Sequence, residues 1–222
     1  MRLKPKPDRY FIVLIGLLTG FILFQVPHLN LPYYWDEAWV YGRGIRLMCI
    51  NGPGISPAAL PVDISRGHPL FFYFAGGVWL KLFGNTILSS HLFALCISVI
   101  LILSAYFLCV KFFGNRIAFL VSLFLMMQAI FLAQSVMVLP EVMLSMWVVL
   151  SVWAFYTGKK ILYLIFAALM LLTKETGIVC VVAIGLNEFI FASEFLRDAK
   201  EMRMLEESGK SQGEKNMDNP MK

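Results

Sequence analysis

The chain has 222 residues, of which 59% are hydrophobic and only 15% charged, and its mean hydropathy is +0.74. This composition excludes an ordinary soluble domain and predicts an integral membrane protein. The formal net charge of +5 does not indicate a nucleic-acid partner, because the basic residues form short clusters between apolar runs rather than one stripe. The cysteines lie far apart without metal-ligand spacing, so they predict neither a zinc site nor a disulfide framework.

Six apolar runs approach or reach the length of about 17 to 25 residues that a transmembrane helix needs. They are residues 10–26, 87–112, 117–134, 142–156, 161–172 and 177–191, of which the fourth and fifth are short. Basic residues precede the first run as in a signal peptide, but the run ends without a cleavage pattern, so we interpret it as a retained span. The sequence therefore predicts an all-α membrane protein with about six transmembrane helices.

A long polar segment separates the first two runs. Residues 28–67 are rich in proline and charge, which predicts an extramembrane loop with short helices around Asp36 to Met48. Residues 69–83 are apolar, but they are few and are interrupted by glycines and a lysine, so they predict an interfacial helix. We expect residues 28–86 to form an extracytoplasmic loop and interfacial helix within a transmembrane module of residues 1–192.

The distribution of charge predicts the orientation of this module, because lysine and arginine accumulate on the cytoplasmic side of short loops. If residues 69–83 do not cross, the N-terminus and residues 193–222 lie inside together with most of the basic residues. Residues 193–222 then form a charged cytoplasmic tail, partly disordered. The protein is expected to be multi-pass, in the plasma membrane, with its active face extracytoplasmic.

Two adjacent acids, Asp36 and Glu37, follow the first span within an aromatic stretch. A carboxylate in hydrocarbon costs about 2.5 to 3.5 kcal/mol, so the pair belongs at a wet membrane surface. The acids could instead begin a loop helix, and the aromatic residues could form an interfacial belt. We favour the functional interpretation.

Other candidate groups fall on the same outer face. His68 and Glu141 adjoin prolines and could simply begin helices. Lys174 and Glu175 lie at the end of a span, where they could pair locally. Arg43 and Arg46 are three residues apart, so they share a helical face that suits phosphate or lipid headgroups.

Several short motifs occur in a fixed order on this face and between the spans. They are Trp35-Asp36-Glu37, Gly67-His68-Pro69-Leu70, Phe112-Phe113-Gly114, Pro140-Glu141 and Leu172-Thr173-Lys174-Glu175-Thr176-Gly177. In this order and spacing, residues 10–190 resemble the N-terminal half of polyprenyl-phosphate-dependent glycosyltransferases. These are GT-C superfamily enzymes similar to protein O-mannosyltransferases and to the aminoarabinose transferase of lipid A.

The resemblance implies a hexosyltransferase-like enzyme that moves a sugar from a dolichyl or undecaprenyl phosphate carrier to an extracytoplasmic acceptor. It implies that Asp36 is the catalytic base or organises the reaction centre, with Glu37 as its partner. The leaving phosphate needs cations or hydrogen-bond donors. The candidate substrate and phosphate ligands are Arg43, Arg46, Arg66, His68, Glu141, Lys174 and Glu175.

The sequence leaves several alternatives open. The chain is short for such an enzyme, so it could be a fragment, a protein whose site a partner chain completes, or a remnant that has lost catalysis. The competing function is a non-catalytic subunit that binds carrier lipid or serves as a scaffold. A transporter is disfavoured, since it would need acids inside the spans. A divalent cation stays open as a cofactor, and membrane lipid is an expected partner.

Overall fold

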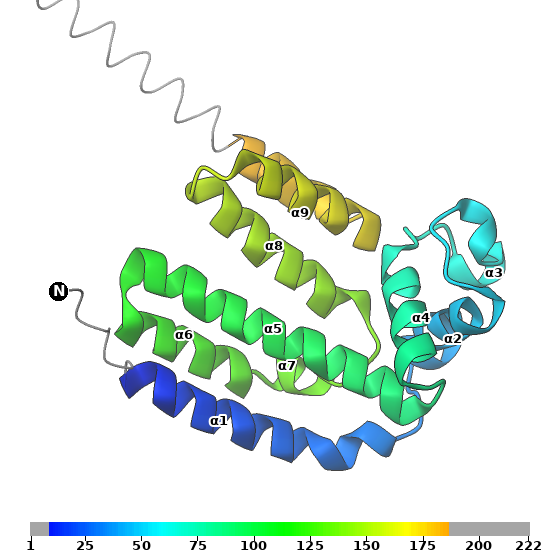
Figure 1. The fold of residues 1–222 in the computed structure, drawn as a ribbon, viewed down its shortest axis with the longest axis horizontal. Coiled ribbons are helices and arrows are strands. Elements are labelled where there is room, and N and C mark those ends of the chain that lie inside the picture. The colour runs from blue at the N-terminus through cyan, green and yellow to red at the C-terminus, as the bar shows by residue number, and fades with distance from the viewer. Residues whose placement is uncertain (1–8, 187–222) are drawn as a thin grey trace, which may run out of the picture. The chain divides into compact units, whose positions relative to one another are not determined.

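The computed structural model describes residues 9–186, and within that range the regular elements are all helices, joined by loops and turns (Figure 1). The all-α prediction is therefore confirmed. The chain divides into two units, residues 1–178 and residues 179–222. A helix from Gly177 to Leu186 runs from the first unit into the second. The end of the predicted span 177–191 and the predicted tail, residues 193–222, lie outside the described residues.

Within residues 9–186, two helices are long and apolar enough to cross a membrane. The first is α1 (Arg9–Gln25) with the 3-10 turn η1 (Val26–Asn30), and the second is α5 (Ile87–Phe113). The other apolar helices of the bundle are shorter: α6 (Asn115–Met127), α7 (Ala129–Gln134), α8 (Pro140–Tyr156) and α9 (Lys160–Thr173). The predicted number of six spans is thus not confirmed among residues 9–186, although five of the apolar runs do form helices there.

The predicted single span over residues 117–134 is wrong. Gln128 has φ −69° and ψ 125°, an extended conformation that ends α6 and separates it from the short helix α7. No proline or glycine marks this break in the sequence. The break directs the chain into a turn before Pro140 begins α8.

Local sequence explains the other helix ends. Thr86 caps α5, because its side-chain oxygen accepts the backbone N–H of Ser89 at 3.1 Å. Gly114, with φ 81°, lies between α5 and α6, and Gly158, with φ 72°, lies between α8 and α9. These left-handed conformations suit glycine and produce short connections between neighbouring helices. Along this part of the chain, α5 packs against both α6 and α8, and α8 packs against α9.

The loop after α1 folds into short helices, as predicted around Asp36 to Met48. The π-helical turn η2 (Glu37–Tyr41) continues into α2 (Gly42–Asn51), and η3 (Pro57–Ala59) and α3 (Val62–Ser65) follow. The apolar run after the loop forms α4 (Phe71–Phe83), which packs on α2. At 1.5 Å per residue α4 is only about 20 Å long, too short to cross a bilayer. That α4 lies at the interface stays a prediction.

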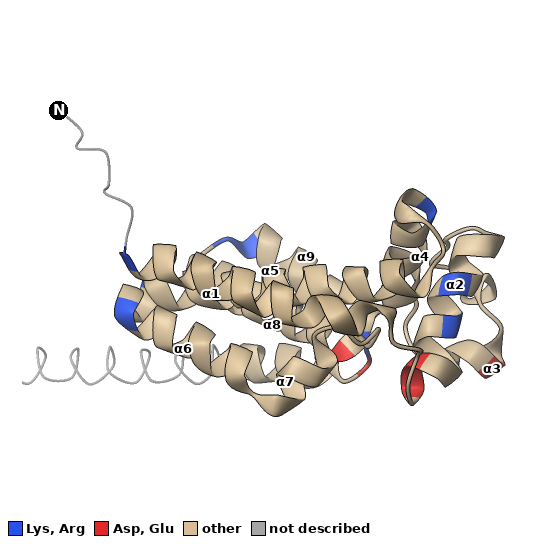
Figure 2. Cartoon of the chain, turned by 90° about the horizontal axis from the view of Figure 1, so that it is seen from below, with Lys and Arg blue, Asp and Glu red and all other residues tan. Residues whose placement is uncertain are grey.

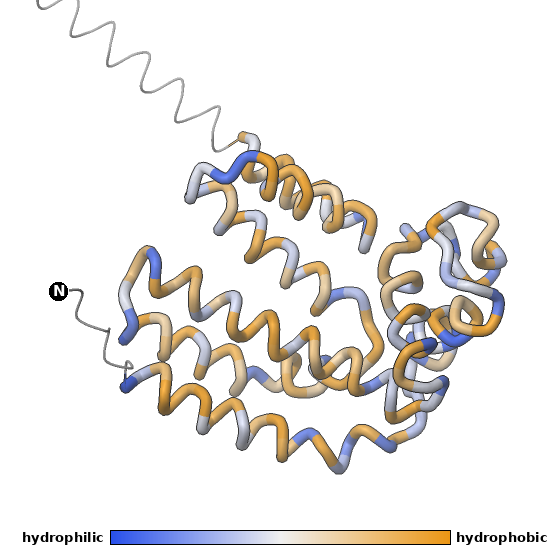
Figure 3. The backbone as a smooth tube through the Cα atoms, in the orientation of Figure 1, coloured by the Kyte–Doolittle hydropathy of each residue, from blue (hydrophilic) through white to orange (hydrophobic). Residues whose placement is uncertain are grey.

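Polar residues concentrate at the ends of the helices. Figure 3 shows tubes that are mainly hydrophobic along the helices and hydrophilic near their ends. Figure 2 shows that the described acids lie toward the end of the first unit that carries α2 and α3, whereas Lys and Arg occur at both ends, on α2 and α4 as well as where α1 and α6 begin. One end of this unit therefore carries the acidic candidate residues.

Candidate functional site

The two adjacent acids of the first loop point into different environments. Asp36 is exposed, whereas Glu37 is only 2% exposed. Trp35, directly before them, has φ 53°, in the left-handed region that bulky residues rarely adopt. The chain thus turns sharply at the start of η2, so that the Asp36 carboxylate faces solvent and the Glu37 carboxylate faces the interior.

Glu37 is held by three donors in the interior. Its Oε1 accepts the backbone N–H of Val138 at 2.6 Å and lies 3.1 Å from His91 Nε2. Its Oε2 accepts the backbone N–H of Tyr34 at 3.2 Å. His91 is itself 2% exposed, and its Nδ1 lies 2.9 Å from the carbonyl oxygen of Leu29. Glu37 and His91 form a buried pair, which we call the Glu37–His91 pair.

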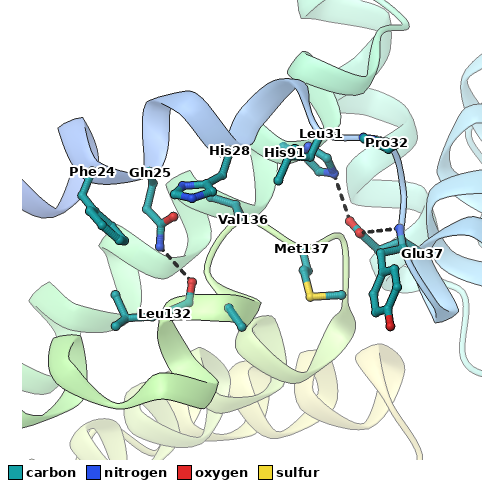
Figure 4. A pocket seen from close by; sticks show the side chains of 12 residues that line it. Phe24, Gln25, His28, Leu31, Pro32, Glu37, His91, Leu132, Val136 and Met137 are labelled. Atoms are coloured by element: carbon teal, nitrogen blue, oxygen red, sulfur yellow. Dashed lines mark hydrogen bonds and ion pairs between the residues drawn. The ribbon is translucent and has the colours of Figure 1, made fainter.

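A cavity of about 390 Å³ borders the Glu37–His91 pair (Figure 4). Gln25 and His28 line it from the end of α1, and Val136 and Met137 line it from the turn before α8. Gln25 Nε2 donates to the carbonyl oxygen of Leu132 at 2.8 Å. The cavity gives small molecules a route toward the carboxylate of Glu37.

A second group of polar side chains surrounds Tyr41 on the other side of η2. Two side-chain contacts connect the loop before α4, the start of α8 and the segment after α9. Lys174 Nζ lies 2.5 Å from Glu141 Oε1, and His68 Nδ1 lies 3.1 Å from Glu175 Oε1. The Tyr41 ring lies 6.1 Å from the His68 ring between centroids. We call the following residues the Tyr41 cluster: Asp36, Tyr41, His68, Glu141, Lys174 and Glu175.

The acids of this cluster act on the Tyr41 hydroxyl through their charge. Burial is the largest cause that raises the pKa of Tyr41, and the negative charges of Glu141, Asp36 and Glu175 raise it further. Arg66 opposes them by lowering the same pKa. Three acids from η2, α8 and the end of α9 therefore act on one phenol, which makes an acidic site with a lysine and a histidine within it.

Glu175 has a lowered pKa. A hydrogen bond with its own backbone N–H is the largest cause, and the hydrogen bond and charge of His68 add to it. Glu141 differs, because its Oε2 is buried and has no hydrogen-bond partner within the described chain. A bound hydroxyl or ammonium group could satisfy that oxygen.

The predicted arginines are not part of these contacts. Arg43 and Arg46 are both exposed on α2, as their spacing predicts, but Arg46 Nε donates to Asn85 Oδ1 at 3.2 Å. Arg66 acts on Tyr41 by charge only. The structure thus brings together Asp36, His68, Glu141, Lys174 and Glu175, and it places Glu37 in the interior. Within residues 9–186, no three His, Cys, Asp or Glu side chains are grouped closely enough to hold a metal ion.

Two residues of these groups escaped the sequence analysis. His91 lies in the second turn of α5, inside an apolar run, and belongs to none of the motifs. Its signal is its polarity, since a histidine in a span needs a partner. Tyr41 belongs to an aromatic stretch that resembles an interfacial belt, so its sequence carries no separate signal.

Helices of membrane length among residues 9–186, with an acidic group of side chains near one end of the first unit, are consistent with a membrane-integral protein. The family model described as dolichyl-phosphate-mannose-protein mannosyltransferase matches residues 67–204, more than half of the chain. The chain therefore belongs to this family of glycosyltransferases, and the resemblance seen in its motifs is confirmed. Comparison with curated proteins and with solved structures gives no match.

Proposed function

We propose that the chain transfers a sugar from a polyprenyl phosphate carrier to an acceptor hydroxyl, with the Tyr41 cluster as its active site on the extracytoplasmic side. Family membership supports the donor class. The observation that carries the proposal is that the charges of Asp36, Glu141 and Glu175 all act on Tyr41. Its ring lies beside His68, and Lys174 pairs with Glu141. Carboxylates and cations at one place are what glycosyl transfer from a phosphate requires.

Residues of the Tyr41 cluster have separate roles in the proposed transfer. The oxygen of the acceptor hydroxyl attacks the anomeric carbon, and the bond from that carbon to the phosphate oxygen breaks. Asp36, the exposed acid, takes the proton of the hydroxyl. The carrier phosphate leaves with the bonding electron pair, and Lys174 and the imidazole of His68 stabilise its charge. Glu141 Oε2, which is buried and lacks a partner among the described residues, accepts a hydrogen bond from the sugar or the acceptor.

The test is sugar transfer by the purified chain in lipid nanodiscs, with dolichyl-phosphate mannose as the first donor. We expect Asp36→Asn to lower the rate about 10²- to 10⁴-fold, the usual contribution of a positioned base. Asp63→Asn is the matched control, because Asp63 is an exposed acid on α3 in the same loop. Binding of the donor, measured on the same samples, should persist in both variants.

The opposite outcomes are equally informative. Equal rates for wild type and Asp36→Asn would show that Asp36 is not the catalytic base. Donor binding without transfer, even by wild type, would reject a self-sufficient enzyme and favour the alternative function, a lipid-binding or scaffold subunit whose catalysis needs another chain.

A further inference from the structure

The Glu37 carboxylate uses both of its oxygens to hold backbone N–H groups. Oε1 accepts from Val138 at 2.6 Å, and Oε2 accepts from Tyr34 at 3.2 Å. A glutamine has a single acceptor oxygen, so it could satisfy one of these N–H groups but would turn its NH₂ toward the other. Only a carboxylate fits both donors.

The protonation of His91 follows from its partners. A carbonyl oxygen only accepts, so Nδ1 carries a hydrogen that it donates to the Leu29 carbonyl. Nε2 faces Glu37 Oε1, which already accepts the Val138 N–H. We assign a second hydrogen to Nε2, so that an imidazolium donates in both directions and neutralises the buried carboxylate.

These bonds join segments that are far apart in the chain. Leu29 lies in η1, Glu37 begins η2, His91 lies in α5, and Val138 lies in the turn before α8. Asp36 directly precedes Glu37, and Glu141 follows Val138 by three residues. The Glu37–His91 pair therefore fixes the two backbone segments that carry these acids.

We infer that Glu37 and His91 are positioning residues that set the placement of Asp36 relative to Glu141. The effect on catalysis rests on the proposed function. The claim that the pair fixes these two backbone segments does not depend on that function. Glu37 is not placed to take a proton from an acceptor, because it is buried and each of its oxygens already accepts a backbone N–H.

The first experiment is hydrogen exchange measured by mass spectrometry in nanodiscs. In Glu37→Ala, Glu37→Gln and His91→Leu, amide exchange in residues 135–139 should accelerate about tenfold, the effect of losing one net hydrogen bond. Exchange in the interior of α8 should stay unchanged, and Asp63→Asn should match wild type throughout. Unchanged exchange in residues 135–139 of all three variants would overturn the inference. Should Glu37→Ala fail to fold, the other two variants carry the same test.

Formate provides a rescue that a general loss of stability would not show. Glu37→Ala leaves space for formate beside the cavity of about 390 Å³, and formate supplies two carboxylate oxygens. Formate should restore slow exchange in residues 135–139 of Glu37→Ala, whereas chloride at the same ionic strength should not. Glu37→Gln fills the space and should not respond, so a response there would contradict the assignment.

The last experiment is sugar transfer from dolichyl-phosphate mannose. Positioning predicts that Glu37→Ala lowers kcat with little change in KM for the donor, and that formate restores part of the rate. Faster exchange with unchanged kcat would reject the positioning role and leave a purely structural pair. Absence of transfer by wild type would instead reject the proposed function, and the exchange and rescue results would still decide whether the pair holds the turn.

Discussion

The Glu37–His91 pair and the Tyr41 cluster both involve the loop after α1, but they differ in how far their charged groups are buried and hydrogen-bonded. Glu37 and His91 are each 2% exposed, and both oxygens of the carboxylate accept backbone N–H groups. In the Tyr41 cluster, the side chains of Lys174 and Glu141 are 19% and 38% exposed, and one Glu141 oxygen lacks a partner in the described part of the chain. A charge whose partners are all internal holds structure, whereas a charge with unused bonding capacity can meet a substrate.

The largest difference between the two regions should appear when a cation is removed from each. His91→Leu leaves the Glu37 carboxylate buried without a counter-charge, which should cost about 3 to 5 kcal/mol of unfolding free energy. Lys174→Ala leaves a partly exposed carboxylate and should cost at most about 1 kcal/mol. Denaturation by SDS in mixed micelles measures both. Equal losses of unfolding free energy in the two variants would contradict the distinction between the structural Glu37–His91 pair and the functional Lys174–Glu141 pair.

A smaller effect should follow from crowding the helices that support the Tyr41 cluster. A Cβ at Gly77 would lie 2.6 Å from Met48 Cβ and 3.2 Å from its carbonyl carbon, so Gly77→Ala forces α2 and α4 apart. Overpacking of this kind costs about 1 to 3 kcal/mol. Gly16→Ala on α1 is the control, because nothing lies within 4 Å of its added Cβ. The control should be neutral or slightly stabilising in the same denaturation experiment. A Gly77→Ala protein as stable as wild type would show that α2 and α4 can separate freely.

The smallest effect concerns pH. The pKa of Glu175 lies below its ordinary value of 4.5, so its carboxylate stabilises the folded chain above that value. This contribution is lost as the pH falls through the lowered pKa. In His68→Ala the pKa should rise only partly toward 4.5, because the residue's own backbone N–H is the larger cause. Infrared titration of the carboxyl group, with Glu175→Gln to assign the band, checks this. An unchanged pKa of Glu175 in His68→Ala would show that His68 does not contribute to lowering it.

Much of the fold could be predicted from where the apolar runs begin and end. Pro140, Gly114 and Gly158 mark ends that the structure places at helix boundaries. The break at Gln128 could not be predicted, because glutamine is a good helix former and packing decides its conformation. Length alone also overestimated the spans, since α6 ends at Met127.

The candidate site was predictable only in part. Charged residues at the ends of apolar runs gave Asp36, His68, Glu141, Lys174 and Glu175, since charges avoid lipid. Whether Glu37 faced the same side as Asp36 depended on the turn at Trp35, which sequence does not reveal. Pairings between distant segments, such as His91 with Glu37, follow from tertiary packing rather than from spacing.

The break between α6 and α7 leaves backbone groups without helical partners. Gln25 donates to the carbonyl oxygen of Leu132 and to Ser135 Oγ, and Ser98 Oγ donates to the carbonyl oxygen of Ser135. Polar side chains on neighbouring helices thus replace the solvent that lipid excludes. Gln25→Leu would remove one of the two hydrogen bonds that the Leu132 carbonyl oxygen accepts and leave it only the one from Ser135 Oγ. Polar residues such as Gln25, Ser98 and Ser135 therefore stabilise the interruption between α6 and α7.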